Sequence, residues 1–207
     1  EDVQVTALVD ARLDLARDLA QQHNVPLYTS NYTEIFDAVD GVIIAVPHHM
    51  HMPIAMEFLA RGIHTLVEKP MAVTADECAR MIATAQQTQA KLGVGLIRRF
   101  YDSSLLIKRL LETQFLGEVQ HFTAEEAVIF ERFRASAFTV LPPAGGVLLD
   151  TGPHLLDTLI WWLGNFDQIH YWDDANGGVE ANCHLEVVTS QGIPGTVELS
   201  RTRQLRN

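Results

Sequence analysis

Short apolar runs alternate with amphipathic stretches over the first hundred residues, and this alternation constrains the fold more than any other feature of the chain. Strands are predicted at residues 3–9, 41–46, 63–67 and 92–97. Helices are predicted at residues 12–23, at residues 53–62 and after Thr74, which forms a capping box with Glu77. Alternation of strands and helices at this spacing predicts right-handed βαβ units and a parallel sheet.

The pattern changes after about Arg98, where long strands replace the alternation. We predict a helix at residues 103–115, a strand at 119–129, a loop at 141–146, an apolar helix at 147–163 and strands near 168–172, 179–190 and 195–201. Long strands with few helices between them predict an open, mainly antiparallel sheet with helices on one face. We therefore expect an α/β protein: a doubly wound parallel-sheet domain at residues 1–98, then an α+β domain at 99–207.

Charge and composition exclude several classes of function. The 15 basic and 26 acidic residues give a net charge of −11, which disfavours nucleic-acid and anionic-membrane partners. No uninterrupted apolar run reaches the roughly 18 residues that a membrane-spanning helix needs. The two cysteines, Cys78 and Cys183, have no metal-like spacing, so a disulfide framework is not expected and a reducing, cytoplasmic location is.

Polar residues follow three of the predicted parallel strands at the point where each strand ends. Asp10 follows the first, the run Pro-His-His-Met-His at residues 47–51 follows "GVIIAV", and Glu68-Lys69-Pro70 follows "HTLV". In an open parallel sheet, ligands bind beyond the carboxyl ends of the strands. The agreement in position therefore predicts a ligand site at this edge.

Asp10 has two interpretations. It accepts hydrogen bonds from the hydroxyls of an adenosine ribose, as the acidic residue of a dinucleotide-binding unit does, or it caps the helix that follows. Arg12 is placed to face a 2′-phosphate, so the choice between NAD and NADP stays open. The histidines at 48, 49 and 51 lack a carboxylate or cysteine at suitable spacing, so no metal is predicted there.

One polar line runs along the otherwise apolar segment "GGVLLDTGPHLLDTLIWWLG". Asp150, His154, Asp157 and Trp161 recur at helical spacing, and Gly152-Pro153 is expected to kink or restart the helix. Buried Asp and His side chains need partners. Either Asp150 and His154 form a structural pair that tethers the helix, or the carboxylate orients an imidazole that acts as a general base.

Four segments in this order resemble the glucose–fructose oxidoreductase/inositol dehydrogenase (Gfo/Idh/MocA) family. They are "AVPHHMH", in place of T-P-N-x-x-H, "VEKP", "GLIRRF", near G-x-x-x-R-[FY], and "GGVLLDTGPHLLD", which matches G-G-x-x-x-D-x-G-x-H-x-x-D. The resemblance implies an N-terminal Rossmann domain that binds NAD or NADP. It also implies a C-terminal substrate domain whose sheet forms homo-oligomers, dimers or tetramers.

The resemblance also implies the reaction, hydride transfer between a nicotinamide cofactor and a secondary alcohol or ketone of a sugar, inositol or related polyol. The implied catalytic residues are Lys69, Asp150 and His154, with His154 as the base. Substrate binding falls to the same three residues and Arg98. Cofactor binding falls to Asp10, Arg12, Pro47, His48, His51, Glu68 and Lys69. Glu68 is expected to hold Lys69 or the strand-end backbone.

Two family features are not present in the sequence. The first strand with its G-x-G-x-x-G turn and the last C-terminal strands are missing, so we expect a chain truncated at both ends. His48 also replaces the usual Asn of the T-P-N loop. The alternative hypothesis is a non-catalytic relative that binds a sugar or nucleotide as a sensor or partner subunit.

Overall fold

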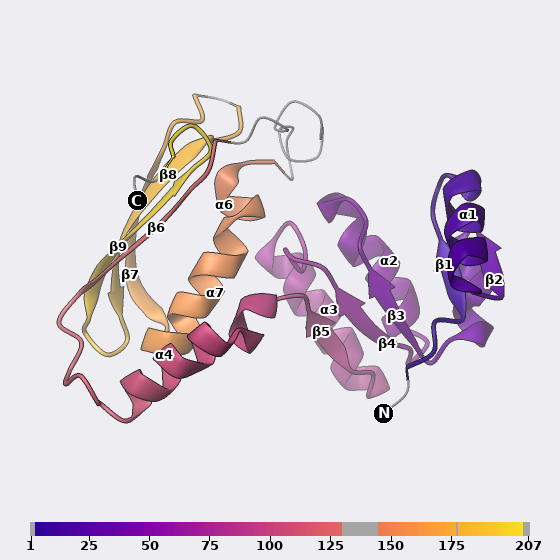
Figure 1. Cartoon of the computed structure of the whole chain (residues 1–207), viewed down its shortest axis with the longest axis horizontal. Coiled ribbons are helices and arrows are strands. Elements are labelled where there is room, and N and C mark those ends of the chain that lie inside the picture. The colour runs from indigo at the N-terminus through magenta and orange to yellow at the C-terminus, as the bar shows by residue number, and fades with distance from the viewer. Residues whose placement is uncertain (1–2, 130–144, 177, 205–207) are drawn as a thin grey trace.

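The computed structural model describes residues 3–129, 145–176 and 178–204. Figure 1 shows a sheet backed by helices at one end of the molecule and layered strands and helices at the other. Apolar side chains form two separate cores, one within residues 7–92 and one within residues 111–199. No helix in the part of the chain that the structure describes is long and apolar enough to cross a membrane.

Within the described residues 3–98, the N-terminal half contains five strands, all paired in parallel, and three α-helices. The order along the chain is β1 (Ala7–Val9), α1 (Leu13–His23), β2 (Leu27–Thr29), β3 (Gly41–Ile44), α2 (His51–Leu59), β4 (His64–Val67), α3 (Ala75–Thr88) and β5 (Leu92–Val94). The predicted parallel pairing is confirmed. Within the described residues, hydrogen bonds join these strands in two groups, β1–β2 and β3–β4–β5.

Local sequence accounts for most of these elements. Thr74 accepts a hydrogen bond from the Glu77 backbone N–H at 3.2 Å, and the Glu77 carboxylate accepts one from the Thr74 N–H at 3.1 Å, so the predicted capping box is confirmed. α2 begins at His51, two residues before the predicted start at Pro53. β2 was not predicted, because a three-residue strand is too short to show an alternating pattern.

The C-terminal half is a four-stranded mixed sheet with helices on one face. Its elements are α4 (Asp102–Glu112), β6 (Phe122–Ala127), α6 (Val147–Asp150), α7 (Gly152–Leu163), β7 (Phe166–Asp173), β8 (Asn182–Thr189) and β9 (Pro194–Ser200). The strand order is β6-β9-β8-β7. Of the pairs among these described strands, β6–β9 is parallel and the other two are antiparallel, so the sheet is mainly antiparallel, as predicted. Residues 141–144 of the predicted loop lie outside the described residues.

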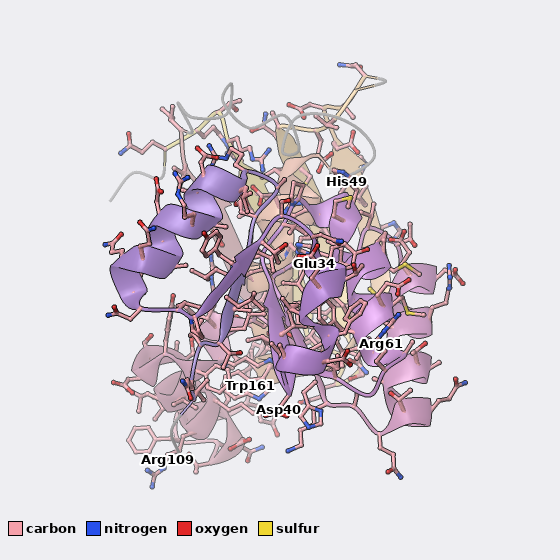
Figure 2. All side chains as sticks on the ribbon, turned by 90° about the vertical axis from the view of Figure 1, so that its right-hand side faces the viewer. Glu34, Asp40, His49, Arg61, Arg109 and Trp161 are labelled. Atoms are coloured by element: carbon pink, nitrogen blue, oxygen red, sulfur yellow. The ribbon has the colours of Figure 1, made fainter. Side chains whose placement is uncertain are left out.

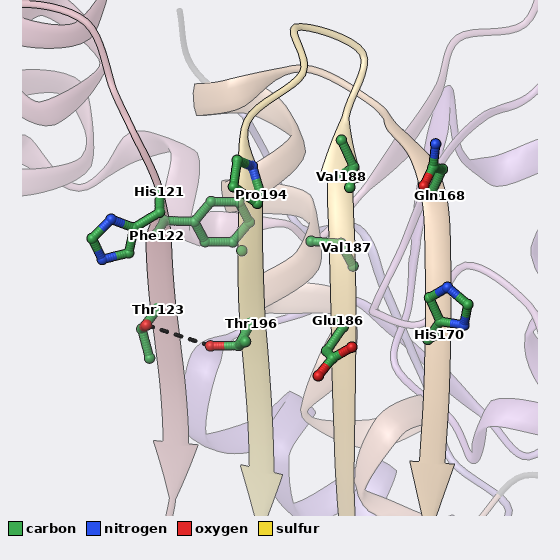
Figure 3. A pocket seen from close by; sticks show the side chains of 11 residues that line it. His121, Phe122, Thr123, Gln168, His170, Glu186, Val187, Val188, Pro194 and Thr196 are labelled. Atoms are coloured by element: carbon green, nitrogen blue, oxygen red, sulfur yellow. Dashed lines mark hydrogen bonds between the residues drawn. The ribbon is translucent and has the colours of Figure 1, made fainter.

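The two faces of this sheet differ in polarity. Cys183, Leu185 and Val187 of β8 are buried against the helices, whereas the alternate residues His184 and Glu186 lie on the other face. That open face carries a shallow hollow of about 410 Å³, shown in Figure 3 with the side chains that line it.

Candidate functional site

The carboxyl ends of β3, β4 and β5 lie level with one another. Ile44 pairs with Val67, and Val67 pairs with Val94, so the residues that follow these strands share one edge of the sheet. In Figure 2, His49 lies at the upper end of these strands, and Asp40, which precedes β3, lies near the lower end. The structure thus brings the run at residues 47–51 and Glu68-Lys69 to the same edge, as predicted.

Glu68 supports the backbone at the end of β4. One of its carboxylate oxygens, Oε2, accepts a hydrogen bond from the Lys69 backbone N–H at 3.2 Å, as expected from the sequence. The carboxylate also packs against Gly95, just past β5: a Cβ atom on Gly95 would lie 2.9 Å from Oε2. A glycine at position 95 therefore leaves the space that the carboxylate occupies.

Lys69 reaches from this strand end to the last residue of α6 in the other half of the chain. Its ammonium donates to the backbone carbonyl of Asp150 at 2.8 Å and to Oδ1 of Asp150 at 3.0 Å. Both side chains are about one-fifth exposed, so the pair is partly shielded from water. The sequence placed these two residues in one site, and the structure brings them into contact.

The other carboxylate oxygen of Asp150, Oδ2, accepts a hydrogen bond from the guanidinium of Arg201. Burial of the Asp150 carboxyl disfavours its charged form, but Lys69, Arg201 and the nearby His48 outweigh burial and hold the pKa of Asp150 below its ordinary value. Arg201 was not predicted as a site residue from the sequence. Its position directly after a strand is no signal, because only the tertiary structure shows that the side chain is buried.

His154 lies one helical turn beyond Asp150, but no hydrogen bond joins the two side chains. The expected orientation of the imidazole by Asp150 is therefore wrong: both oxygens of the carboxylate face cations, which attract it more strongly than a neutral ring. Nδ1 of His154 is buried and has no hydrogen-bond partner among the described residues. α7 restarts at Gly152 with Pro153 in its first turn, as predicted, and so separates His154 from α6.

The electrostatic surroundings of His154 favour a neutral imidazole. Burial lowers its pKa most, and the cations of Lys69 and Arg98 lower it further; Glu126 and Glu68 oppose the shift without reversing it. A neutral ring near pH 7 has a lone pair with which to accept a proton. Arg98 itself forms a two-pronged ion pair with Glu126 of β6, with both N–O distances at 2.6 Å.

The other two residues of the polar line, Asp157 and Trp161, have partners on another element. The guanidinium of Arg99 binds both carboxylate oxygens of Asp157, at 2.6 and 2.7 Å, and lies 5.6 Å from the ring centroid of Trp161. These contacts tie α7 to the chain segment that links the two halves. Asp157 and Trp161 thus anchor the helix, while Asp150 and His154 remain at the site.

His51 is fully buried beneath the site. Its Nδ1 lies 2.7 Å from the carbonyl oxygen of Pro70, and its Nε2 lies 2.8 Å from that of Val46. The ring therefore links the backbone after β3 to the backbone after β4. Both nitrogens face carbonyl oxygens, so neither is available to a metal. No group of three His, Cys, Asp or Glu side chains within the described ranges is arranged to hold one.

Asp10 lies at the end of β1, in the smaller of the two parallel sheets. Its Oδ1 accepts a hydrogen bond from the Arg12 backbone N–H at 2.8 Å, and the Arg12 guanidinium lies 3.8 Å from the same oxygen. The residue at the N-cap position of α1 is Arg12, so the interpretation of Asp10 as the N-cap is wrong. The carboxylate is still partly exposed, with donors on one side and solvent on the other.

Two family models match the chain. Residues 1–96 match a family model described as an oxidoreductase family with an NAD-binding Rossmann fold, and residues 104–207 match the GFO/IDH/MocA C-terminal domain. The chain is 30% identical over 153 residues to trans-1,2-dihydrobenzene-1,2-diol dehydrogenase from Xenopus tropicalis, covering 73% of this chain and 46% of that protein.

Two further likenesses extend the comparison. Glucose-6-phosphate 3-dehydrogenase from Bacillus subtilis (strain 168) is 30% identical over 143 residues, which cover 67% of this chain and 41% of that protein. The structure of the WlbA dehydrogenase from Bordetella pertussis with NADH and UDP-GlcNAcA superimposes with a TM-score of 0.88 at 18% identity, covering 98% of this chain and 60% of that one. The chain thus spans about half the length of the curated relatives it matches.

Proposed function

The chain belongs to the Gfo/Idh/MocA oxidoreductase family, and from this premise we propose that it is part of an NAD(P)-dependent dehydrogenase. The proposed substrate is a secondary alcohol or ketone of a sugar, inositol or related polyol. The observation that carries the proposal is the contact between Lys69 and Asp150, which places an ammonium beside His154 at the carboxyl edge of the parallel strands. The relatives named as a diol dehydrogenase and a sugar-phosphate dehydrogenase support the class of reaction.

In the proposed mechanism His154 removes the hydroxyl proton of the substrate. Because burial and two cations lower its pKa, the ring is neutral and ready to accept that proton near pH 7. The transfer uses Nε2, since Nδ1 is enclosed by protein. A bound nicotinamide supplies the chemistry of hydride acceptance.

Lys69 stabilises the negative charge that develops on the substrate oxygen. An ammonium has three donors, and the contacts to Asp150 use two of them. The third hydrogen bonds the reacting oxygen in this mechanism, where a preorganised charge lowers the barrier. Asp150 keeps Lys69 in place, and Arg98, fixed by Glu126, borders the substrate.

The residues at the strand ends fit a dinucleotide. The partly exposed carboxylate of Asp10 suits ribose hydroxyls, and Arg12 beside it suits a 2′-phosphate, so either cofactor form is compatible with this pair. Pro47, His48 and Glu68 form the part of the edge next to Lys69, where we place the nicotinamide end, and the buried His51 supports this edge from beneath. On this proposal residues 1–98 hold the cofactor and residues 99–207 hold the substrate.

We further propose that the protein is cytoplasmic and assembles with a second copy through the open face of the β6-β9-β8-β7 sheet. Trp172 on this face is half exposed and lies between His170 and His184, with ring centroids 6.2 and 5.6 Å away. Trp172→Glu should convert the oligomer to a monomer in light scattering. A wild-type monomer at micromolar concentration would contradict the assembly.

The dehydrogenase is tested with the full-length protein and a panel of polyols, amino sugars and sugar nucleotides. NADH and NADPH titrations by fluorescence measure cofactor binding, and absorbance at 340 nm measures turnover. Lys69→Ala and His154→Ala should each lower turnover by about two orders of magnitude or more and leave cofactor binding near normal. Cofactor or sugar binding with no turnover on the whole panel would favour the sensor or partner-subunit alternative.

A further inference from the structure

Arg201 directly follows β9, and its guanidinium is buried beside the proposed active site. Only 5% of its side chain is exposed, whereas the nearby Arg203 is 57% exposed. Its backbone N–H donates to the Ala181 carbonyl at 2.9 Å, which fixes the point from which the side chain extends. A buried guanidinium is stable only with a charged or hydrogen-bonding partner, and Asp150 is such a partner.

The carboxylate of Asp150 is divided between two cations. Oδ2 faces Arg201 and Oδ1 faces Lys69, so the planar group cannot turn to offer both oxygens to Lys69. Lys69 therefore donates one hydrogen bond to a carboxylate oxygen of Asp150 and one to its backbone carbonyl. The third N–H of the ammonium stays available for a substrate oxygen.

We propose that Arg201 is a positioning residue for Lys69 and acts through Asp150. The inference rests on the proposed function, because it assigns Arg201 a part in that reaction. By binding Oδ2, the guanidinium fixes the orientation of the carboxylate, so that Oδ1 points toward Lys69. It also prevents Oδ2 from accepting a hydrogen bond from the third N–H of the Lys69 ammonium. Arg201 does not touch the reacting atoms in this account.

The first experiment measures kcat and KM of the full-length protein on its best substrate from the panel. Arg201→Met should lower kcat about 10- to 100-fold, the scale of loss for a misplaced catalytic group, while KM for the cofactor changes less than about twofold. Arg201→Lys should recover part of kcat, because it keeps the charge but loses the rigid fork. Arg61→Met is the matched control: it removes an ion pair with Glu57 that has no contact with Asp150.

A second comparison separates positioning from a merely structural role. If Arg201 acts through Asp150, the second substitution should matter little once the first is present. The double variant Asp150→Asn/Arg201→Met should therefore have a kcat less than about threefold below that of Asp150→Asn alone. An unchanged kcat in Arg201→Met, or the same loss in the Asp150→Asn background, would overturn the inference.

A crystal structure of Arg201→Met tests the role of Arg201 independently of whether the protein is a dehydrogenase. Absence of NAD(P)-linked turnover in the wild-type protein counts against the dehydrogenase alone. In the variant crystal, Asp150 should turn so that both of its oxygens contact the ammonium of Lys69. An Asp150 carboxylate that keeps its wild-type orientation would overturn the role of Arg201, whatever the outcome of the activity assay.

Discussion

The ammonium of Lys69 lies 2.8 Å from the backbone carbonyl oxygen of Asp150 and 3.0 Å from its carboxylate, although 81 positions separate the two residues. One belongs to the end of a parallel strand and the other to the end of a short helix beside the mixed sheet. This contact therefore joins the two halves of the chain at the site, and any loss of it affects both the geometry of the site and its charge.

Asp150→Asn should lower the free energy of unfolding by about 3 kcal/mol at pH 7, because it leaves two cations facing a neutral amide. The pKa of the Asp150 carboxyl lies below its ordinary value of 3.8 in the folded protein. The stability that the charged form contributes is thus complete above pH 3.8 and is lost as pH falls through the lower, folded value. Denaturant titrations from pH 7 to pH 3 should show the gap between wild type and variant closing at the acid end. A gap that stays constant would contradict this.

Arg98→Met should move the acid limb of the kcat/KM profile, which reports groups of the free enzyme, to higher pH. Activity falls when His154 becomes protonated, and its lowered pKa places that limb below pH 6.5. Removing the Arg98 cation and leaving Glu126 unpaired both raise the pKa of His154. Arg98→Lys keeps the charge and should leave the limb close to that of the wild type. A limb that moves to lower pH in Arg98→Met would refute the assignment of His154 as the group that titrates.

His51→Phe should lower the free energy of unfolding by about 1–3 kcal/mol, because the imidazole donates to the carbonyl oxygen of Pro70 or of Val46, according to its tautomer, and that carbonyl loses its buried donor. The backbone after β4 carries Lys69, so kcat should fall as well. His49→Ala, at an exposed position two residues earlier, is the control. Equal melting temperatures for the two variants would show that the two carbonyl contacts do not support the strand ends.

Gly95→Ala should lower the melting temperature slightly and reduce turnover, because the new Cβ atom would lie 2.9 Å from the carboxylate of Glu68, the end of a flexible side chain, and displace it. The Lys69 backbone N–H then loses its acceptor. Shortening the displaced side chain should relieve the clash, so the double variant Gly95→Ala/Glu68→Ser should regain part of the lost melting temperature. Additive losses in the double variant would contradict a steric cause.

Much of the fold is local in origin and was predicted from the sequence. The capping box of Thr74 and Glu77 and the helix restart at Gly152-Pro153 depend on residues a few positions apart, so their pattern is visible in the chain itself. The short strand β2 and the division of the parallel strands into two sheets were not predicted, because they depend on pairing between separate segments.

The same distinction applies to the site. The sequence alone determined that Lys69 follows a parallel strand and that Asp150 and His154 share one side of a helical segment. Both follow from the spacing of apolar residues and from the alternation of strands and helices, which can be read along the chain. Only the tertiary structure decided that Asp150 binds Lys69 and Arg201 rather than His154. That choice depends on which charges become buried together, and burial is a property of the packed molecule.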